Sequence, residues 1–161
     1  MEKIIKLKKL LNNFNLDGYI VPKNDEFFGE YIHESKDKLK FISDFSGSYG
    51  FALILKNKNY LFVDGRYTQQ AKNQSKKFFN IITIPNKFPS DVLKKKILKI
   101  GFDPKLHTQK SLKIFFNKTN CKLVPINANL IDKIWIKKKK NKSKKFYILP
   151  KKAVSQNYRI K

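Results

Sequence analysis

The best candidate for chemistry in this chain is Arg66, which follows an apolar run in the segment Asp64-Gly65-Arg66-Tyr67. A guanidinium carries a rigid fork of donors that suits a carboxylate or a carbonyl oxygen. We expect Asp64 to cap a helix start, Gly65 to let Arg66 leave a strand end at an unusual angle, and Tyr67 to support the turn. The alternative is a buried ion pair of Arg66 with Asp64 or Asp44 that serves only the fold.

The sequence offers no complete set of metal ligands and no acid–base pair. His33 and His107 are the only histidines, and neither has a partner at a metal-binding spacing such as His-Glu-x-x-His. We expect each histidine to be a surface or capping residue, and Asp64, Asp103 and Asp132 to cap helices or turns. We therefore predict no catalytic residue and no metal ligand in this chain.

Acidic side chains gather in residues 23–34 and could suggest a metal site. Glu26, Glu30 and Glu34 would share one face of a helix, where like charges repel one another. Their spacing matches no closed ligand set. We therefore predict a polar surface segment with its aromatic residues turned inward, namely Phe27, Phe28 and Tyr31.

A β-hairpin is predicted to position Arg66. Residues 51–55 and 60–63 are apolar runs of strand length, and the polar residues 56–59 between them are typical of a turn. The glycines in residues 46–50 allow the chain to bend sharply before the first of these strands. Arg66 then lies where the second strand ends.

The rest of the chain alternates between helical and strand patterns. Expected helices are 2–13, 35–42 with Ser35 as its cap, 67–75, 90–98, 109–117 and 129–135, and further expected strands are 18–21, 79–84, 100–103 and 121–125. Because the hairpin is antiparallel while later units cross over, we predict an α/β protein, a three-layer α/β/α domain with a mixed, mostly parallel sheet. Trp135 should anchor the last helix against the domain.

The formal net charge of +24 raises the alternative of a stand-alone basic module that binds nucleic acid through its tail. Residues 136–161 hold eleven Lys or Arg and no acid, which leaves 25 basic against 12 acidic residues before them. Lysines without interleaved aromatics or an arginine-rich motif are typical of a solvated segment or of codon bias. We therefore do not expect nucleic acid to be the partner.

Composition indicates one compact domain with an extension, since 161 residues leave no room for a second full domain. The lone Cys121 excludes an internal disulfide and is expected to be a small core residue near a strand start. Residues 1–14 interleave lysines with apolar residues, unlike a secretory leader, and no run reaches membrane-spanning length. We expect a cytoplasmic protein with no membrane partner.

Several separate motifs occur in one order and carry a family resemblance. They are Asp25-Glu26, Glu30-Tyr31-Ile32, Phe45-Ser46-Gly47-Ser48 with Gly50, Val63-Asp64-Gly65-Arg66-Tyr67 with Gln70-Ala71, Gly101-Phe102-Asp103-Pro104, and Asn129-Leu130-Ile131-Asp132-Lys133-Ile134-Trp135. Together they resemble the first, creatinase-N-type domain of the long, three-domain Xaa-Pro aminopeptidases, also called aminopeptidase P. The resemblance covers residues 1–135.

The resemblance implies a non-catalytic domain that positions substrate and assists assembly of a metal-dependent Xaa-Pro aminopeptidase. In that family the chemistry belongs to a later domain of the pita-bread type, whose two metal ions, typically manganese, are held by Asp, Asp, His, Glu and Glu. No segment here matches that set, so we expect no cofactor in this chain and no activity of the chain alone. The resemblance assigns Arg66 to substrate binding, in contact with a peptide that has proline at its second position. A homo-oligomer is a further possible partner.

The resemblance also divides the chain. Residues 1–135 form the creatinase-N-type domain, and 136–161 are expected to be a Lys-rich linker followed by the start of a truncated second domain. This division predicts a truncated gene product, one half of a split gene, or a fragment of a longer protein.

Overall fold

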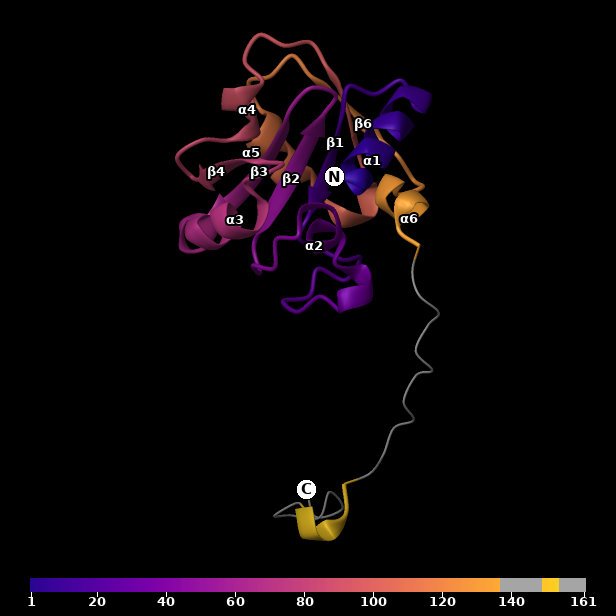
Figure 1. The fold of residues 1–161 in the computed structure, drawn as a ribbon, viewed down its shortest axis with the longest axis vertical. Helices are drawn as coiled ribbons and strands as arrows, with labels where there is room; N and C mark the ends of the chain where they lie inside the picture. Colours follow the sequence, from indigo (N-terminus) through magenta and orange to yellow (C-terminus); the bar gives the residue numbers. More distant parts are fainter. Residues whose placement is uncertain (137–148, 154–161) are drawn as a thin grey trace.

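The computed structural model describes residues 1–136 and 149–153. Most of residues 136–161, the expected linker and start of a second domain, therefore lie outside the described residues. Residues 1–136 fold around one sheet with helices on both of its faces (Figure 1). This is the α/β class that the sequence predicts.

The sheet has six strands in the order β4-β3-β2-β1-β5-β6. Their bounds are β1 (Gly18–Pro22), β2 (Gly50–Leu55), β3 (Asn59–Asp64), β4 (Asn80–Ile84), β5 (Lys99–Phe102) and β6 (Lys122–Pro125). β2 is antiparallel to both of its neighbours, β1 and β3, and the other pairings are parallel. The predicted mixed and mostly parallel sheet is confirmed.

Two hydrophobic cores explain the layers. The first lies under α1 (Glu2–Asn13), α2 (Lys38–Ser43), α3 (Thr68–Ser75) and α6 (Leu130–Ile134), and the second under α4 (Pro89–Val92) and α5 (Gln109–Phe116). Alternate residues of β2 serve the two cores: Ala52 and Ile54 face the first, and Phe51 and Leu53 the second. A strand buried on both faces therefore appears in sequence as a continuous apolar run.

Two predicted helices differ from the observed ones. The helix predicted at 35–42 is a 3₁₀ turn, η1 (Glu34–Lys36), followed by α2, and the caps are the side chains of His33 and Asp37 rather than Ser35. The helix predicted at 90–98 ends at Val92, and Lys95 adopts a left-handed φ of 61°. The lysine run after Val92 has no apolar periodicity that would bury a longer helix against the sheet.

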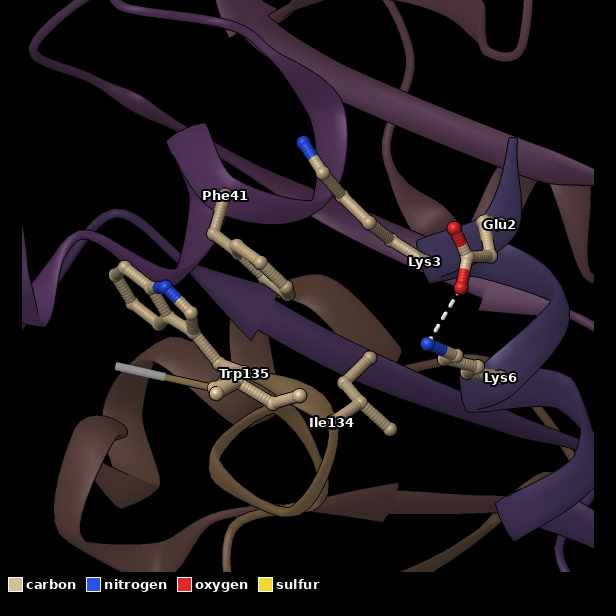
Figure 2. Close-up of a pocket in the computed structure, with 7 residues that line it drawn as sticks. Glu2, Lys3, Lys6, Phe41, Ile134 and Trp135 are labelled. Atoms are coloured by element: carbon tan, nitrogen blue, oxygen red, sulfur yellow. Dashed lines mark ion pairs between the residues drawn. The ribbon is translucent and has the colours of Figure 1, made fainter. Parts of the chain in front are cut away.

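Trp135 anchors the end of the domain, as predicted. Its ring stacks on Phe41 of α2 with the centroids 4.6 Å apart and the planes 14° from parallel. Figure 2 shows the two rings side by side at the rim of an open hollow of about 250 Å³. Glu2 and Ile136 also line this hollow, so the first helix and the chain leaving α6 meet there.

The strand directions bring several loops to one end of the sheet. β1, β3, β4, β5 and β6 all finish at this end and β2 begins there, as their pairing registers require. We call it the carboxyl end. It carries the segments at 23–37, 44–49, 64–67 and 103–108. In Figure 1 the first of these segments lies beside α2, below the sheet.

Candidate functional site

Arg66 lies in a 3₁₀ turn, η2 (Gly65–Tyr67), that begins where β3 ends. Asp64 caps this turn, as predicted, because its Oδ1 accepts the Arg66 backbone N–H at 2.9 Å. The same oxygen also accepts the Arg66 Nε–H at 2.9 Å. One carboxylate oxygen therefore fixes both the backbone and the side chain of the arginine.

The Arg66 side chain is 75% exposed and that of Asp64 is 35% exposed. Their hydrogen bond lowers the pKa of the Asp64 carboxyl and raises the pKa of the guanidinium, so the pair stays ionised. Among the described residues Asp64 is the only acceptor of an Arg66 side-chain hydrogen bond, and Nε is the donor used. The outer two nitrogens of the fork remain available to a ligand.

The alternative of a buried structural pair is wrong. The Arg66–Asp64 pair exists, but it lies at the surface. Asp44 does not reach Arg66 and instead pairs with Lys3 at 3.0 Å. The arginine is therefore presented to solvent rather than sealed in the core.

Tyr67 supports the turn, as predicted. Its ring lies 5.6 Å from the Arg66 guanidinium carbon and meets the Phe45 ring edge-on at 6.1 Å. Its hydroxyl is hydrogen bonded to Ser48 Oγ at 2.7 Å. These contacts tie the arginine turn to the loop that precedes β2.

The role predicted for Gly65 is wrong. Gly65 has no left-handed φ, and an added Cβ would meet only Thr83 Cγ2 at 3.8 Å, an ordinary contact. Near this turn a glycine is required at Gly50 instead, where an added Cβ would lie 2.7 Å from the Phe62 carbonyl oxygen. The sharp departure from β3 comes from the Asp64 cap instead.

Two glutamines hold the neighbouring loop: Gln70, which the sequence analysis named in a motif without a role, and Gln74, which it did not name. Ser46 Oγ accepts hydrogen bonds at 2.9 Å from both Gln70 Nε2 and Gln74 Nε2. The Ser46 backbone N–H donates to Gln74 Oε1 at 3.0 Å. Their spacing of four residues on α3 places both amides on one helix face, which was the available signal.

The histidines do not come together. His33 is exposed and caps η1, as predicted. His107 is partly buried rather than at the surface, and it occupies the C-cap position of the 3₁₀ turn η3 (Pro104–Leu106). Its Nε2 is shielded from solvent with no hydrogen-bond partner in the described part of the chain. Burial lowers the pKa of His107 to about 4. Nearby, Asp103 caps a turn through Lys105 N and accepts a bond from Asn129 Nδ2 at 2.7 Å.

The acidic segment at 23–34 is a surface segment, as predicted, but its aromatic residues point outward. Phe27, Phe28 and Tyr31 are all exposed, so the prediction that they turn inward is wrong. No helix spans this segment, and Glu26 pairs instead with Lys36.

The described residues contain neither a metal-binding cluster nor a membrane-spanning helix. In residues 1–136 and 149–153 no group of three or more His, Cys, Asp or Glu side chains is arranged to hold a metal ion. Within the same residues no helix is long and apolar enough to span a bilayer. Most of the basic tail lies outside this part of the chain.

The fold and the site define an α/β domain that presents one oriented arginine at the carboxyl end of a mixed sheet. Residues 3–134 match the family described as Creatinase/Prolidase N-terminal domain. The chain belongs to this family.

Known proteins with similar sequences are named as Xaa-Pro aminopeptidases. "Probable Xaa-Pro aminopeptidase P" of Coprinopsis cinerea is 33% identical over 144 residues, which cover 83% of this chain and 23% of that protein. The protein of the same name from Penicillium rubens is 31% identical over 170 residues, which cover 99% of this chain and 28% of that protein. The chain thus spans about a quarter of the length of these relatives.

Solved structures agree with the family. The X-prolyl aminopeptidase of Caenorhabditis elegans, described as a cytosolic enzyme with a di-nuclear active site, superposes with a TM-score of 0.74 and 29% identity, covering 83% of this chain and 25% of its own. The N-terminal domain of the cytoplasmic peptidase PepQ from Mycobacterium tuberculosis shares the fold, with a TM-score of 0.64, 20% identity, and coverage of 83% and 98%.

Proposed function

We propose that this chain is the substrate-positioning and assembly domain of a metal-dependent Xaa-Pro aminopeptidase, in which Arg66 contacts the bound peptide. The observation that carries the proposal is the exposed Arg66 guanidinium, oriented by Asp64 at the carboxyl end of the sheet. Removal of an N-terminal residue before proline requires the peptide to lie in one register. A fixed fork of donors outside the metal site favours one register by binding a carbonyl or carboxylate oxygen.

The composition of the chain supports a specific need for arginine at this position. Of the 36 basic residues only Arg66 and Arg159 are arginines, and Arg66 is the only one among the described residues. A chain that uses lysine almost everywhere else retains a guanidinium at this turn. Lysine supplies one compact charge, whereas arginine supplies a planar fork that makes two parallel hydrogen bonds.

In this proposal the chain binds and orients, and the chemistry belongs to a catalytic portion supplied in the same polypeptide or by another one. Metal ions, manganese by family resemblance, would be held by that portion. The proposed compartment is the cytoplasm, in keeping with the C. elegans relative. The proposed substrate is a peptide with proline at its second position.

The proposal is tested in a chimera that carries residues 1–135 in place of the matching N-terminal part of the C. elegans X-prolyl aminopeptidase. Arg66→Lys should raise KM for a Xaa-Pro peptide about tenfold or more and leave kcat nearly unchanged, because an interaction made equally in ground and transition states is lost. Steady-state kinetics measures both constants.

The matched control is Lys56→Ala. Lys56 also pairs with an aspartate, Asp17, at 3.4 Å, but it lies at the other end of the hairpin. The control should leave KM unchanged. Equal KM values for the Arg66→Lys chimera and its parent would exclude a contact between Arg66 and the peptide.

The chain alone is expected to be inactive. With Mn²⁺ and a Xaa-Pro peptide, the purified 161-residue chain should release no N-terminal amino acid, because its described residues include no set of side chains that could hold the metal. Release is measured by mass spectrometry of the peptide. Turnover that survives Arg66→Lys but requires Mn²⁺ would show that the chain carries a metal site of its own.

A further inference from the structure

Exposed aromatic side chains gather at the carboxyl end of the sheet. Phe27 is 75% exposed, Phe28 46%, Tyr31 86% and Tyr49 47%. We call these four residues the aromatic surface. Single exposed apolar residues are common in soluble proteins, but several large rings on neighbouring loops mark a contact site.

The segment that carries three of these rings is firmly anchored at its base. Lys23 Nζ lies 2.5 Å from Asp37 Oδ2, and both side chains are only 9% exposed. Asn24 Nδ2 donates to the Leu106 carbonyl at 3.3 Å, and the buried Asp25 accepts the Phe27 N–H at 3.0 Å. The rings therefore lie on a segment whose two ends are fixed to the rest of the domain.

The segment that carries the aromatic surface lacks the basic excess of the rest of the chain. Residues 25–37 contain five of the 12 acidic residues and a single lysine, in a chain with a net charge of +24. The hydrogen bond from Lys36 lowers the pKa of Glu26, which keeps that carboxylate ionised. Asp25 and Asp37 are buried, and Glu26 and Glu34 pair with Lys36 and Lys40, so the rings carry no basic excess around them. Such a surface disfavours nucleic acid and anionic membranes, and it suits a protein partner.

The aromatic surface is continuous with the Arg66 turn. Ser48, hydrogen bonded to Tyr67 of that turn at 2.7 Å, directly precedes Tyr49. The Lys23 N–H donates to the Gly50 carbonyl at 2.9 Å, which joins the same loop to the aromatic segment. A polypeptide that lies over Arg66 would therefore also be close enough to cover the aromatic surface.

We propose that the aromatic surface docks against the catalytic portion of the Xaa-Pro aminopeptidase. This inference rests on the proposed function, which places that portion over Arg66. The chain spans only 23% of its C. cinerea relative, so most of that protein's length is available to form the opposing surface. Tyr and Phe are enriched at the desolvated centre of protein interfaces, where they contribute much of the binding energy.

Hydroxyl-radical footprinting of the chimera and of the free 161-residue chain tests this docking. Oxidation of Tyr31, 86% exposed in the chain, should fall about tenfold in the chimera, to the level of a residue at an interface core. Tyr49 should be protected as well. Equal oxidation rates in the two proteins, or protection of the free chain that rises with its concentration and so indicates a second copy, would overturn the proposal.

A variant pair separates docking from general destabilisation. Phe27→Ser/Tyr31→Ser should restore oxidation of Tyr49 in the chimera to the rate in the free chain. Ile97→Ser/Ile114→Ser, which changes two exposed apolar residues away from the carboxyl end, should not. If both pairs expose Tyr49 equally, the protection is not due to the rings.

The two proposals fail in different ways. Protected rings together with a KM that does not respond to Arg66→Lys would leave the docking intact and remove the peptide contact. Unprotected rings together with a KM that does respond would remove the docking and leave the peptide contact intact.

Discussion

Asp64 connects the fold of the turn to the presentation of Arg66, because its Oδ1 accepts both the backbone N–H and the Nε–H of the arginine. Asparagine at this position keeps the cap but loses the charge that holds the guanidinium. In the chimera, Asp64→Asn should raise KM for the peptide while the thermal midpoint stays close to that of the parent. Kinetics and thermal unfolding on the same preparation check this.

Asp64→Ala is the comparison variant, since it removes the cap as well. It should raise KM and also lower the thermal midpoint. If Asp64→Asn left KM untouched, Arg66 would not depend on its aspartate for orientation.

His107 gives the fold a defined dependence on pH. Its pKa is about 4 in the folded chain, because burial disfavours the charged ring, against about 6.5 in the unfolded chain. The unfolded state therefore binds more protons between these values, so the stabilising effect of neutral His107 is complete above pH 6.5 and is lost as pH falls toward 4. The expected loss is about 3 kcal/mol.

Urea unfolding at pH 7 and pH 4.5 measures most of this loss, since pH 4.5 still lies above the folded pKa, and His107→Gln provides the reference. The variant should lose less stability over the same pH range than the parent. Parallel losses in the two proteins would assign the pH dependence to the carboxylates instead.

At the scale of the element, the loop after β1 depends on the buried pair between Lys23 and Asp37, 2.5 Å apart. Lys23→Met should destabilise the chain by about 3 kcal/mol, because it leaves the Asp37 carboxylate buried without its partner. The control is Lys3→Met, which breaks the exposed Lys3–Asp44 pair and should cost less than about 1 kcal/mol. Urea midpoints give both values.

A second substitution shows whether the unpaired charge is the cause. Asp37 also caps α2 through Lys40 N, and asparagine preserves that cap. Lys23→Met/Asp37→Asn should therefore recover part of the stability that Lys23→Met loses. A double variant less stable than either single one would point to lost packing.

The positions of all six strands could be predicted from local patterns, within a residue or two at their ends. Short apolar runs bounded by glycine, proline or polar turns located all six strands, and the hairpin set the direction of β2 and β3. The prediction of a helix at 90–98 failed because the length of a helix depends on its packing against the rest of the fold more than on local propensity. The prediction that the aromatic side chains at 27–31 are buried also failed. Aromatic rings are usually buried, but whether they are covered depends on residues far away in the chain.

The Arg66 site was also only partly predictable. The cap by Asp64 is a local interaction between neighbours, so sequence spacing was sufficient to find it. The contacts of Ser46 with α3 join segments 24 and 28 residues apart, and they depend on the packing of α3 against the loop. The exposure of the Arg66 guanidinium distinguishes a ligand-binding arginine from a buried ion pair. It too depends on how the loops pack at the carboxyl end of the sheet.

At the scale of the whole molecule, the described domain should unfold as one unit. Trp135 is the only tryptophan of the chain and follows α6, and its ring stacks on Phe41 of α2. α6 packs against α1, and both helices contribute to the first core. The fluorescence of Trp135 should therefore change when the sheet unfolds. Tryptophan emission and far-ultraviolet circular dichroism should give coincident urea transitions.

Trp135→Phe is the control for the optical probe, since it keeps a stacking ring and should leave the dichroism midpoint nearly unchanged. An emission change at lower urea than the loss of dichroism would show that α6 separates first. In that case the first core would be two units rather than one.

Glu2 and Ile136 line the same hollow, so the entry and exit of the domain adjoin. A short linker across that gap would permit circular permutation, with new termini opened in the exposed turn at residues 57–58. Because its two ends adjoin, the domain could also be inserted into a single loop of another protein.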